Sequence, residues 1–295
     1  MRFFNFIKSG VSIAIVGIIL FSAKAVMVKL AYQYQVSSIH LLLFRLGFSL
    51  PIYIAFILYY KPKQKEVIKK SDYVWLLFFG FIGYYLASYF DFLGLQYIKA
   101  GLERIVLFVY PTLVLLISRL FFKKTLQKKQ VVAIFVTYIG VVIAFWNEIE
   151  LSEGNLYLGV FLVFLSALAY ASYLVGSGWL IPKFGVVLFT SYAMVVSTIC
   201  VVVHYLITDR LPLVNYPREV YVLGALMAFV STLIPSFLVS LAIKKMGAST
   251  FSIIGSIGPI STIILAYIFL NETVSGLQIF GSVIVISGVV FVAKK

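Results

Sequence analysis

Long apolar runs alternate with short polar segments along the whole chain. Ten of these runs are close to the ~20 residues that a helix needs to cross a lipid bilayer. The runs are residues 11–30, 40–60, 73–94, 101–121, 130–147, 155–176, 185–207, 220–243, 248–270 and 276–293. The pattern therefore predicts an all-α integral membrane protein with ten transmembrane helices and almost no soluble part.

Composition supports this prediction and narrows it. The 295 residues are 62% hydrophobic and 12% charged, whereas a soluble domain is roughly a quarter charged. The first run is long, contains two lysines and is not followed by a small-residue cleavage pattern, so we expect a retained helix and not a cleaved signal. The single cysteine, Cys200, excludes a disulfide framework within the chain.

The net charge of +14 could indicate nucleic-acid binding, but its distribution favours another explanation. If the N-terminus is cytoplasmic, 17 of the 24 Lys and Arg residues fall in cytoplasmic segments and five in external ones, as the positive-inside rule requires. We therefore predict a bacterial cytoplasmic (inner) membrane protein with both termini cytoplasmic. Topology and anionic lipids explain the basic clusters better than nucleic acid. The sequence gives no indication of oligomeric state.

The chain also matches itself. A shift of 148 positions places Pro111 on Pro259 and Gly140 on Gly288, and a shift of 149 places Phe21 on Tyr170. This predicts one five-helix repeat over residues 1–147, an external acidic linker over 148–154 and a second repeat over 155–295. Because five is an odd number, the two repeats would point in opposite directions across the membrane. Such inverted repeats are typical of secondary transporters, which bind substrate between their halves.

Five ionisable residues lie in or beside the predicted spans toward the external side: Lys24, Arg45, Asp91, Glu103 and Arg104. The corresponding positions of the second half carry no charge: Tyr173, Ala193, Val239, Phe251 and Ser252. Charged side chains within a membrane are costly and usually face a cavity or each other. Three interpretations remain open: a structural salt-bridge lattice, a substrate-recognition site or gate, and proton coupling. Since neighbouring residues do not face each other on a helix, Glu103 and Arg104 are expected to have different partners.

Uncharged residues supply further candidates. Tyr84 and Tyr110 could stack on an organic solute or simply pack. Ser252 and Ser256 lie on one helical stripe that would face the cytoplasmic mouth of a cavity, although serines also permit close helix packing. Pro111 and Pro259 each remove a backbone donor and are expected to kink the fourth and ninth helices.

Several of these residues also carry a family resemblance that covers nearly the whole chain. The mid-helix prolines of "VYPTL" and "IGPIS", the segment "LNETVSGLQIFGSVIVISGVV" and Arg45 in "LLLFRLGFSL" resemble the EamA-type carriers of the drug/metabolite transporter superfamily. The second half carries the acidic loop signature Asn271-Glu272-Thr273. The first half departs from it and has Lys123-Lys124-Thr125 at the corresponding positions. The resemblance implies a metabolite carrier, often an exporter, with a cavity lined by helices 1 to 4 and 6 to 9.

Other functional classes find less support in the sequence. HExxH and GxSxG motifs are absent, and His40 and His204 are far apart in the sequence, so neither an enzyme, a metal site nor a cofactor is predicted. A retinal-type photoreceptor would need a lysine within 276–293, which has none. We therefore predict an alternating-access transporter that exports a small organic metabolite, such as an amino acid or a related compound. A channel, or a non-transporting scaffold or lipid-translocation partner, remains an alternative.

Overall fold

The computed structural model describes residues 10–60, 68–98, 100–125, 127–144, 146, 155–208, 212–270 and 274–293. All regular elements in these residues are helical, which confirms the predicted all-α class. The first half contains α2 (Gly10–Tyr32), α3 (Ser38–Tyr59), α4 (Lys70–Gly80), η1 (Phe81–Leu86), α5 (Ala87–Tyr97), α6 (Ala100–Leu107), α7 (Tyr110–Phe122) and α8 (Lys128–Ala144). The second contains α10 (Leu156–Phe184), α11 (Val186–Thr208), α12 (Arg218–Ala228), η2 (Phe229–Leu233), α13 (Ile234–Met246), α14 (Ala248–Ile254), α15 (Ile257–Leu270) and α16 (Gly276–Ala293).

These helices correspond to the ten predicted runs, and two runs in each half are interrupted. The third run of each half contains a π-helical turn, η1 or η2. The fourth run is broken between α6 and α7 and again between α14 and α15. Pro111 and Pro259 lie just after these breaks, within the first turn of α7 and α15, where a missing backbone donor costs little. Each proline therefore begins a new helical segment and does not bend a continuous helix.

Length and hydropathy qualify seven described helices to cross a membrane. They are Gly10–Tyr32, Ser38–Tyr59, Lys70–Tyr97, Leu156–Phe184, Val186–Thr208, Arg218–Met246 and Ala248–Leu270. Tyr110–Phe122 and Gly276–Val292 are apolar but shorter. The linker predicted at 148–154 lies outside the described residues.

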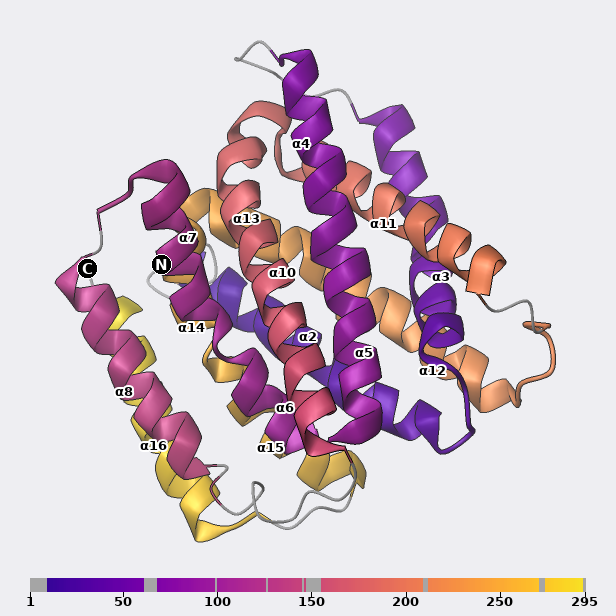
Figure 1. Cartoon of the computed structure of the whole chain (residues 1–295). Coiled ribbons are helices and arrows are strands. Elements are labelled where there is room, and N and C mark those ends of the chain that lie inside the picture. Colours follow the sequence, from indigo (N-terminus) through magenta and orange to yellow (C-terminus); the bar gives the residue numbers. More distant parts are fainter. Residues whose placement is uncertain are drawn as a thin grey trace, which may run out of the picture.

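Helices of the two halves pack on each other in exchanged pairs. α2 packs on α13 and α15, while α10, its counterpart, packs on α5 and α7. Two further contacts join counterparts directly: α3 packs on α11, and α8 packs on α16. Figure 1 shows α8 and α16 running side by side at one edge of the molecule. The halves thus meet through equivalent surfaces.

Individual glycines repeat this exchange. A Cβ on Gly10 would lie 2.8 Å from Met246, and a Cβ on Gly159, the counterpart of Gly10, would lie 2.6 Å from Ile98. Ile98 is in turn the position that corresponds to Met246 at the 148-residue offset. Small residues at these positions let two helix backbones approach closely, as is common in membrane interfaces.

The α8–α16 pair shows the same relation. A Cβ on Gly140 would lie 2.7 Å from the carbonyl oxygen of Gly281, and one on Gly288 would lie 3.2 Å from the carbonyl oxygen of Ala133. Gly288 and Ala133 are the counterparts of Gly140 and Gly281 at the 148-residue offset. The contact is therefore self-complementary, which is the property of an interface related by a two-fold axis.

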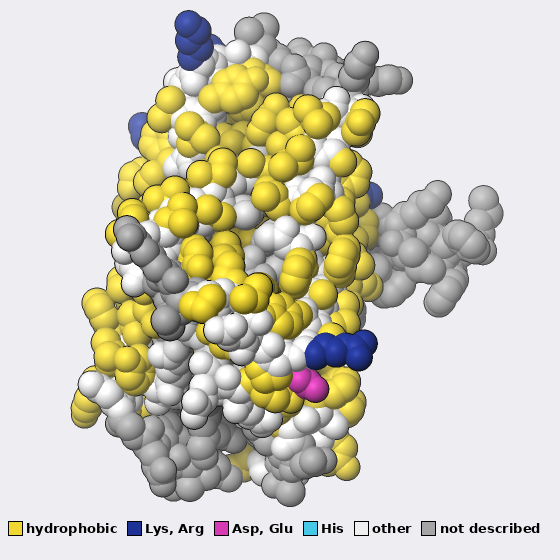
Figure 2. All heavy atoms as spheres, turned by 90° about the vertical axis from the view of Figure 1, so that its right-hand side faces the viewer, with side chains coloured by type: hydrophobic (Ala, Val, Ile, Leu, Met, Phe, Trp, Pro, Cys, Tyr) yellow, Lys and Arg dark blue, Asp and Glu magenta, His cyan; other side chains and the backbone are white. Residues whose placement is uncertain are grey.

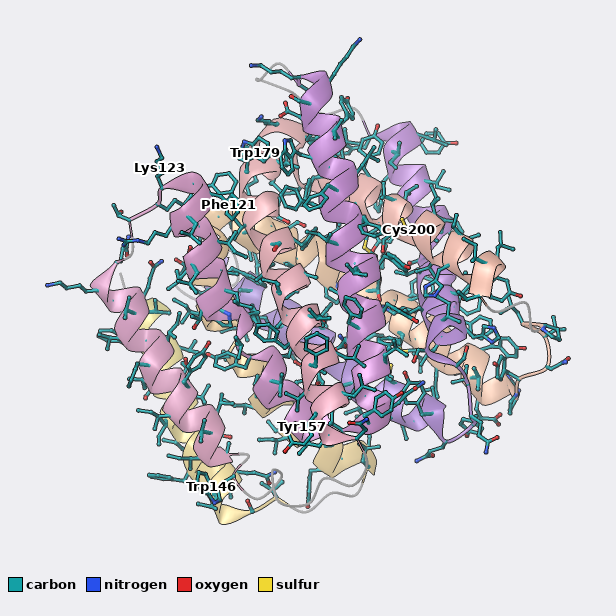
Figure 3. The ribbon with its side chains drawn as sticks, in the orientation of Figure 1. Phe121, Lys123, Trp146, Tyr157, Trp179 and Cys200 are labelled. Atoms are coloured by element: carbon teal, nitrogen blue, oxygen red, sulfur yellow. The ribbon has the colours of Figure 1, made fainter. Side chains whose placement is uncertain are left out.

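The outer surface suits a lipid environment. Figure 2 shows a face on which hydrophobic side chains form a broad band with few charged groups. Aromatic side chains mark both ends of the molecule: Figure 3 places Trp179 near the end of α7 that carries Lys123, and Trp146 and Tyr157 toward the opposite end. Trp146 and Tyr157 are 56% and 87% exposed. Such aromatic residues are enriched at the two membrane–water interfaces.

Candidate functional site

The five ionisable residues singled out from the sequence are all buried. Lys24 of α2 is 3% exposed, Arg45 of α3 0%, Asp91 of α5 1%, and Glu103 and Arg104 of α6 0% and 5%. We call these five residues the charge cluster. Their helices meet because α2 packs on α5 and α6, and α3 packs on α5. The structure therefore brings together residues that lie up to 80 positions apart in the chain.

One ion pair connects the first helix to the third helical run. The Lys24 ammonium donates to Asp91 Oδ2 at 2.5 Å, and both side chains are at least 96% buried. Asp91 Oδ1 has no hydrogen-bond partner among the described residues. The pair is thus a buried, charge-assisted hydrogen bond with one acceptor left over.

The second pair corrects an expectation from the sequence. Glu103 and Arg104 were expected to choose different partners, but Arg104 Nε lies 2.9 Å from Glu103 Oε2. The expectation was wrong because a long arginine side chain can fold back to its neighbour when both side chains are enclosed. The relative orientation of the Arg104 and Glu103 side chains does not allow a hydrogen bond between them. Both Glu103 oxygens remain without a hydrogen-bond partner in the described part of the chain.

Arg45 differs from the other two bases because its hydrogen-bond partners among the described residues are hydroxyl groups. Its Nε donates to Thr232 Oγ1 at 2.7 Å and its Nη1 donates to Ser88 Oγ at 3.3 Å. Its Nη2 has no partner among the described residues. The guanidinium also lies 5.6 Å from the centre of the Phe92 ring, which Lys24 approaches at 5.9 Å.

Two small cavities lie between the halves beside the charge cluster. The larger has a volume of about 40 Å³; Arg104, Tyr110 and Pro259 are among its lining residues. The smaller, of about 20 Å³, includes Lys24 and Tyr84 in its wall. Cavities of this size hold a water molecule or two but no organic solute. The structure is therefore closed around its centre.

Aromatic rings form much of the cavity walls. Phe21 and Tyr170 line both cavities and stack with ring centroids 6.1 Å apart and an interplanar angle of 11°. Tyr170 also packs edge-on against Tyr110 at 5.4 Å, while Tyr84 packs against Tyr173 at 4.8 Å. The tyrosines proposed to contact a solute thus lie at the cavity.

Sequence reasoning placed two serines less well and missed other lining residues. The hydroxyls of Ser252 and Ser256 donate to carbonyls of their own segment, at 2.9 and 2.7 Å, and neither residue lines the two cavities. Ser22 and Ser166 do line them. The stacking of Phe21 on Tyr170 had a signal in the sequence, because these two residues are superimposed by the 149-residue shift.

Comparison with known proteins fits this arrangement. The sequence profile of the EamA-like transporter family matches residues 8–146 and, a second time, residues 157–294. The chain belongs to the EamA-like transporter family. The two matches of the family profile fall on the two halves that pack through equivalent surfaces. Membership makes this a membrane transporter and indicates that it is not an enzyme.

Several relatives resemble this family member over most of their length. It is 30% identical over 279 residues to "Uncharacterized transporter YcbK" of Bacillus subtilis (strain 168), covering 92% of this chain and 89% of that protein. "Uncharacterized transporter YyaM" of the same organism is 24% identical over 253 residues, covering 83% of this chain and 81% of YyaM. One crystal structure of a protein superposes with a TM-score of 0.76 at 15% identity, covering 97% of this chain and 96% of the other. That likeness concerns the fold alone.

Proposed function

We propose that this EamA-family protein is a secondary transporter that works by alternating access and exports a small organic metabolite, such as an amino acid or a related compound, across the bacterial cytoplasmic membrane. The observation that carries the proposal is the exchange of contacts between the two halves around a central cavity. A carrier needs two halves that can open to either side of one binding site.

The orientation of the halves follows from their contacts and their number of helical runs. Self-complementary contacts, such as Gly140 on Gly281 with Gly288 on Ala133, are those of a two-fold relation. Phe21 and Tyr170 are counterparts that touch each other, which only residues beside such an axis can do. With five runs in each half, chain direction across the membrane reverses between them, so the axis would lie in the membrane plane.

The same axis would pass beside both cavities, because Phe21 and Tyr170 line both. The cavity walls therefore supply the central substrate site, and the charge cluster supplies a gate on one side of it. With both termini cytoplasmic, as the distribution of basic residues predicts, this gate is external. Separation of α2, α5 and α6 would open the gate, while the hydroxyl-rich second half would form the cytoplasmic mouth.

Metabolite profiling in the native host tests the export proposal. We expect a deletion strain to retain one class of organic solute in the cytosol and an overexpressing strain to enrich the same solute in the medium. Unchanged profiles in both strains would contradict export. Single-channel currents in planar bilayers would favour a channel instead, and stable purification with one partner protein without solute flux would favour a scaffold.

A further inference from the structure

The charge cluster contains three bases and two acids, all at least 95% buried. Lys24 is matched by Asp91 and Arg104 by Glu103. Arg45 is left without a carboxylate within ion-pair distance among the described residues, although Asp91 attracts it from further away. The cluster therefore has a formal excess of one positive charge, carried by Arg45.

Hydroxyl groups cannot remove this excess. Thr232 and Ser88 accept hydrogen bonds from Arg45 but contribute no negative charge. A buried guanidinium without a counter-ion is costly in a medium of low dielectric constant, and a membrane-embedded cation usually marks a functional site. Arg45 also retains a buried donor, Nη2, without a partner in the described part of the chain. Both the charge and the free donor call for an anionic acceptor.

The substrate cavity lies within reach of this donor group. Arg45 donates to Ser88, and Ser88 lines the smaller cavity together with Lys24 and Tyr84. Arg45 and Lys24 further approach the same ring, that of Phe92. An anionic group in the smaller cavity would thus lie beside Lys24, and on displacing the Ser88 hydroxyl it would reach Arg45.

The remaining wall describes the rest of the ligand. Phe21, Tyr84 and Tyr170 present aromatic surface to the smaller cavity, which suits a planar or apolar organic body. The planar fork of arginine matches the two oxygens of a carboxylate. We infer that the transported solute is an organic carboxylate with an apolar or aromatic body, and that Arg45 is the residue that binds its carboxylate.

This inference rests on the proposed transport function, so its test separates the two. Proteoliposomes containing the whole chain are loaded with an aqueous small-molecule extract of the host, and solutes released faster than from protein-free liposomes are identified by mass spectrometry. Release of carboxylates supports both statements. Release of solutes that lack an acidic group would overturn the inference and leave the carrier function intact, whereas no release of any solute would count against the carrier function as well.

Variants then test Arg45 itself with the carboxylate found in the extract. Arg45→Gln should reduce its initial release rate at low concentration by about tenfold or more, since hydrogen bonds between charged groups contribute that much to affinity. The control Arg119→Gln, at an exposed base of α7, should match wild type. If folded Arg45→Gln protein transports at the wild-type rate, Arg45 is not the anchor.

A conservative variant decides the case if Arg45→Gln does not fold. Arg45→Lys keeps the positive charge but loses the planar fork, so we expect a KM raised several-fold with little change in kcat. A wild-type KM in Arg45→Lys would overturn the assignment, and a rise in KM limited to carboxylate solutes would support it. Purified, monodisperse protein with a wild-type circular dichroism spectrum is required for each comparison.

Discussion

The ion pair between Lys24 of α2 and Asp91 of α5 should contribute strongly to the stability of the contact between these two helices. Their charged atoms are 2.5 Å apart, and the side chains are 4% and 1% exposed. At an effective dielectric constant of ~20, Coulomb's law gives an attraction of roughly 7 kcal/mol at this distance. Desolvation of both groups offsets much of it. The net worth of the pair is therefore smaller than the cost of removing one partner alone.

We expect Lys24→Met and Asp91→Asn each to lower the free energy of unfolding by about 3–5 kcal/mol, because each leaves an uncompensated buried charge. Asp91→Asn should be the more harmful, since it leaves Lys24 near Arg104 and Arg45, whose positive charges repel the Lys24 ammonium. The double variant Lys24→Met/Asp91→Asn leaves neither charge. Its loss should fall well below the sum of the two single losses, with a coupling energy of about 2 kcal/mol or more.

The measurement is a double-mutant cycle of reversible unfolding in mixed detergent micelles, followed by circular dichroism. Transport in proteoliposomes is measured on the same preparations. The exposed control Arg119→Gln should change stability by less than ~0.5 kcal/mol. Additivity of Lys24→Met and Asp91→Asn within ~0.5 kcal/mol would refute the reasoning, because it would show that the two groups do not interact. Loss of transport in both folded single variants would support the gate over a purely structural lattice.

Three further predictions concern packing, closure and topology. Gly140→Leu should destabilise the α8–α16 pair by about 1–3 kcal/mol, because even a Cβ at this position would lie 2.7 Å from the Gly281 carbonyl oxygen. The control is Gly47→Ala, where nothing lies within 4 Å of an added Cβ. Equal melting temperatures for Gly140→Leu and Gly47→Ala would contradict the close contact. A Cβ on Gly255 would overlap the Tyr110 hydroxyl, so Gly255→Ala should slow transport in proteoliposomes and Tyr110→Phe should partly restore it; a wild-type rate in Gly255→Ala would show that closure does not need this contact. A reporter fused after Lys295 should be cytoplasmic and one inserted near Ser152 external, and the opposite readings would reverse the proposed side of the gate.

The sequence alone determined the helical class, the approximate ranges of the helices and the two related halves. These properties follow from local patterns: apolar runs of membrane-spanning length, Lys and Arg in short loops, and a repeated spacing of Pro, Gly and Ser. The burial of the charge cluster was also predictable, because ionisable residues within apolar runs have few other places to go.

Only the tertiary structure decided which charged groups meet and which do not. Helical periodicity fixes the direction of a side chain on its own helix, but it contains no information about the distance to another helix. The pairing of Lys24 with Asp91 and the bonding of Arg45 to Thr232, 187 positions away, therefore had no local signal. The same holds for the breaks before Pro111 and Pro259: a proline predicts a disturbed helix, while the packing of α6, α7, α14 and α15 around the cavity decides where that helix divides.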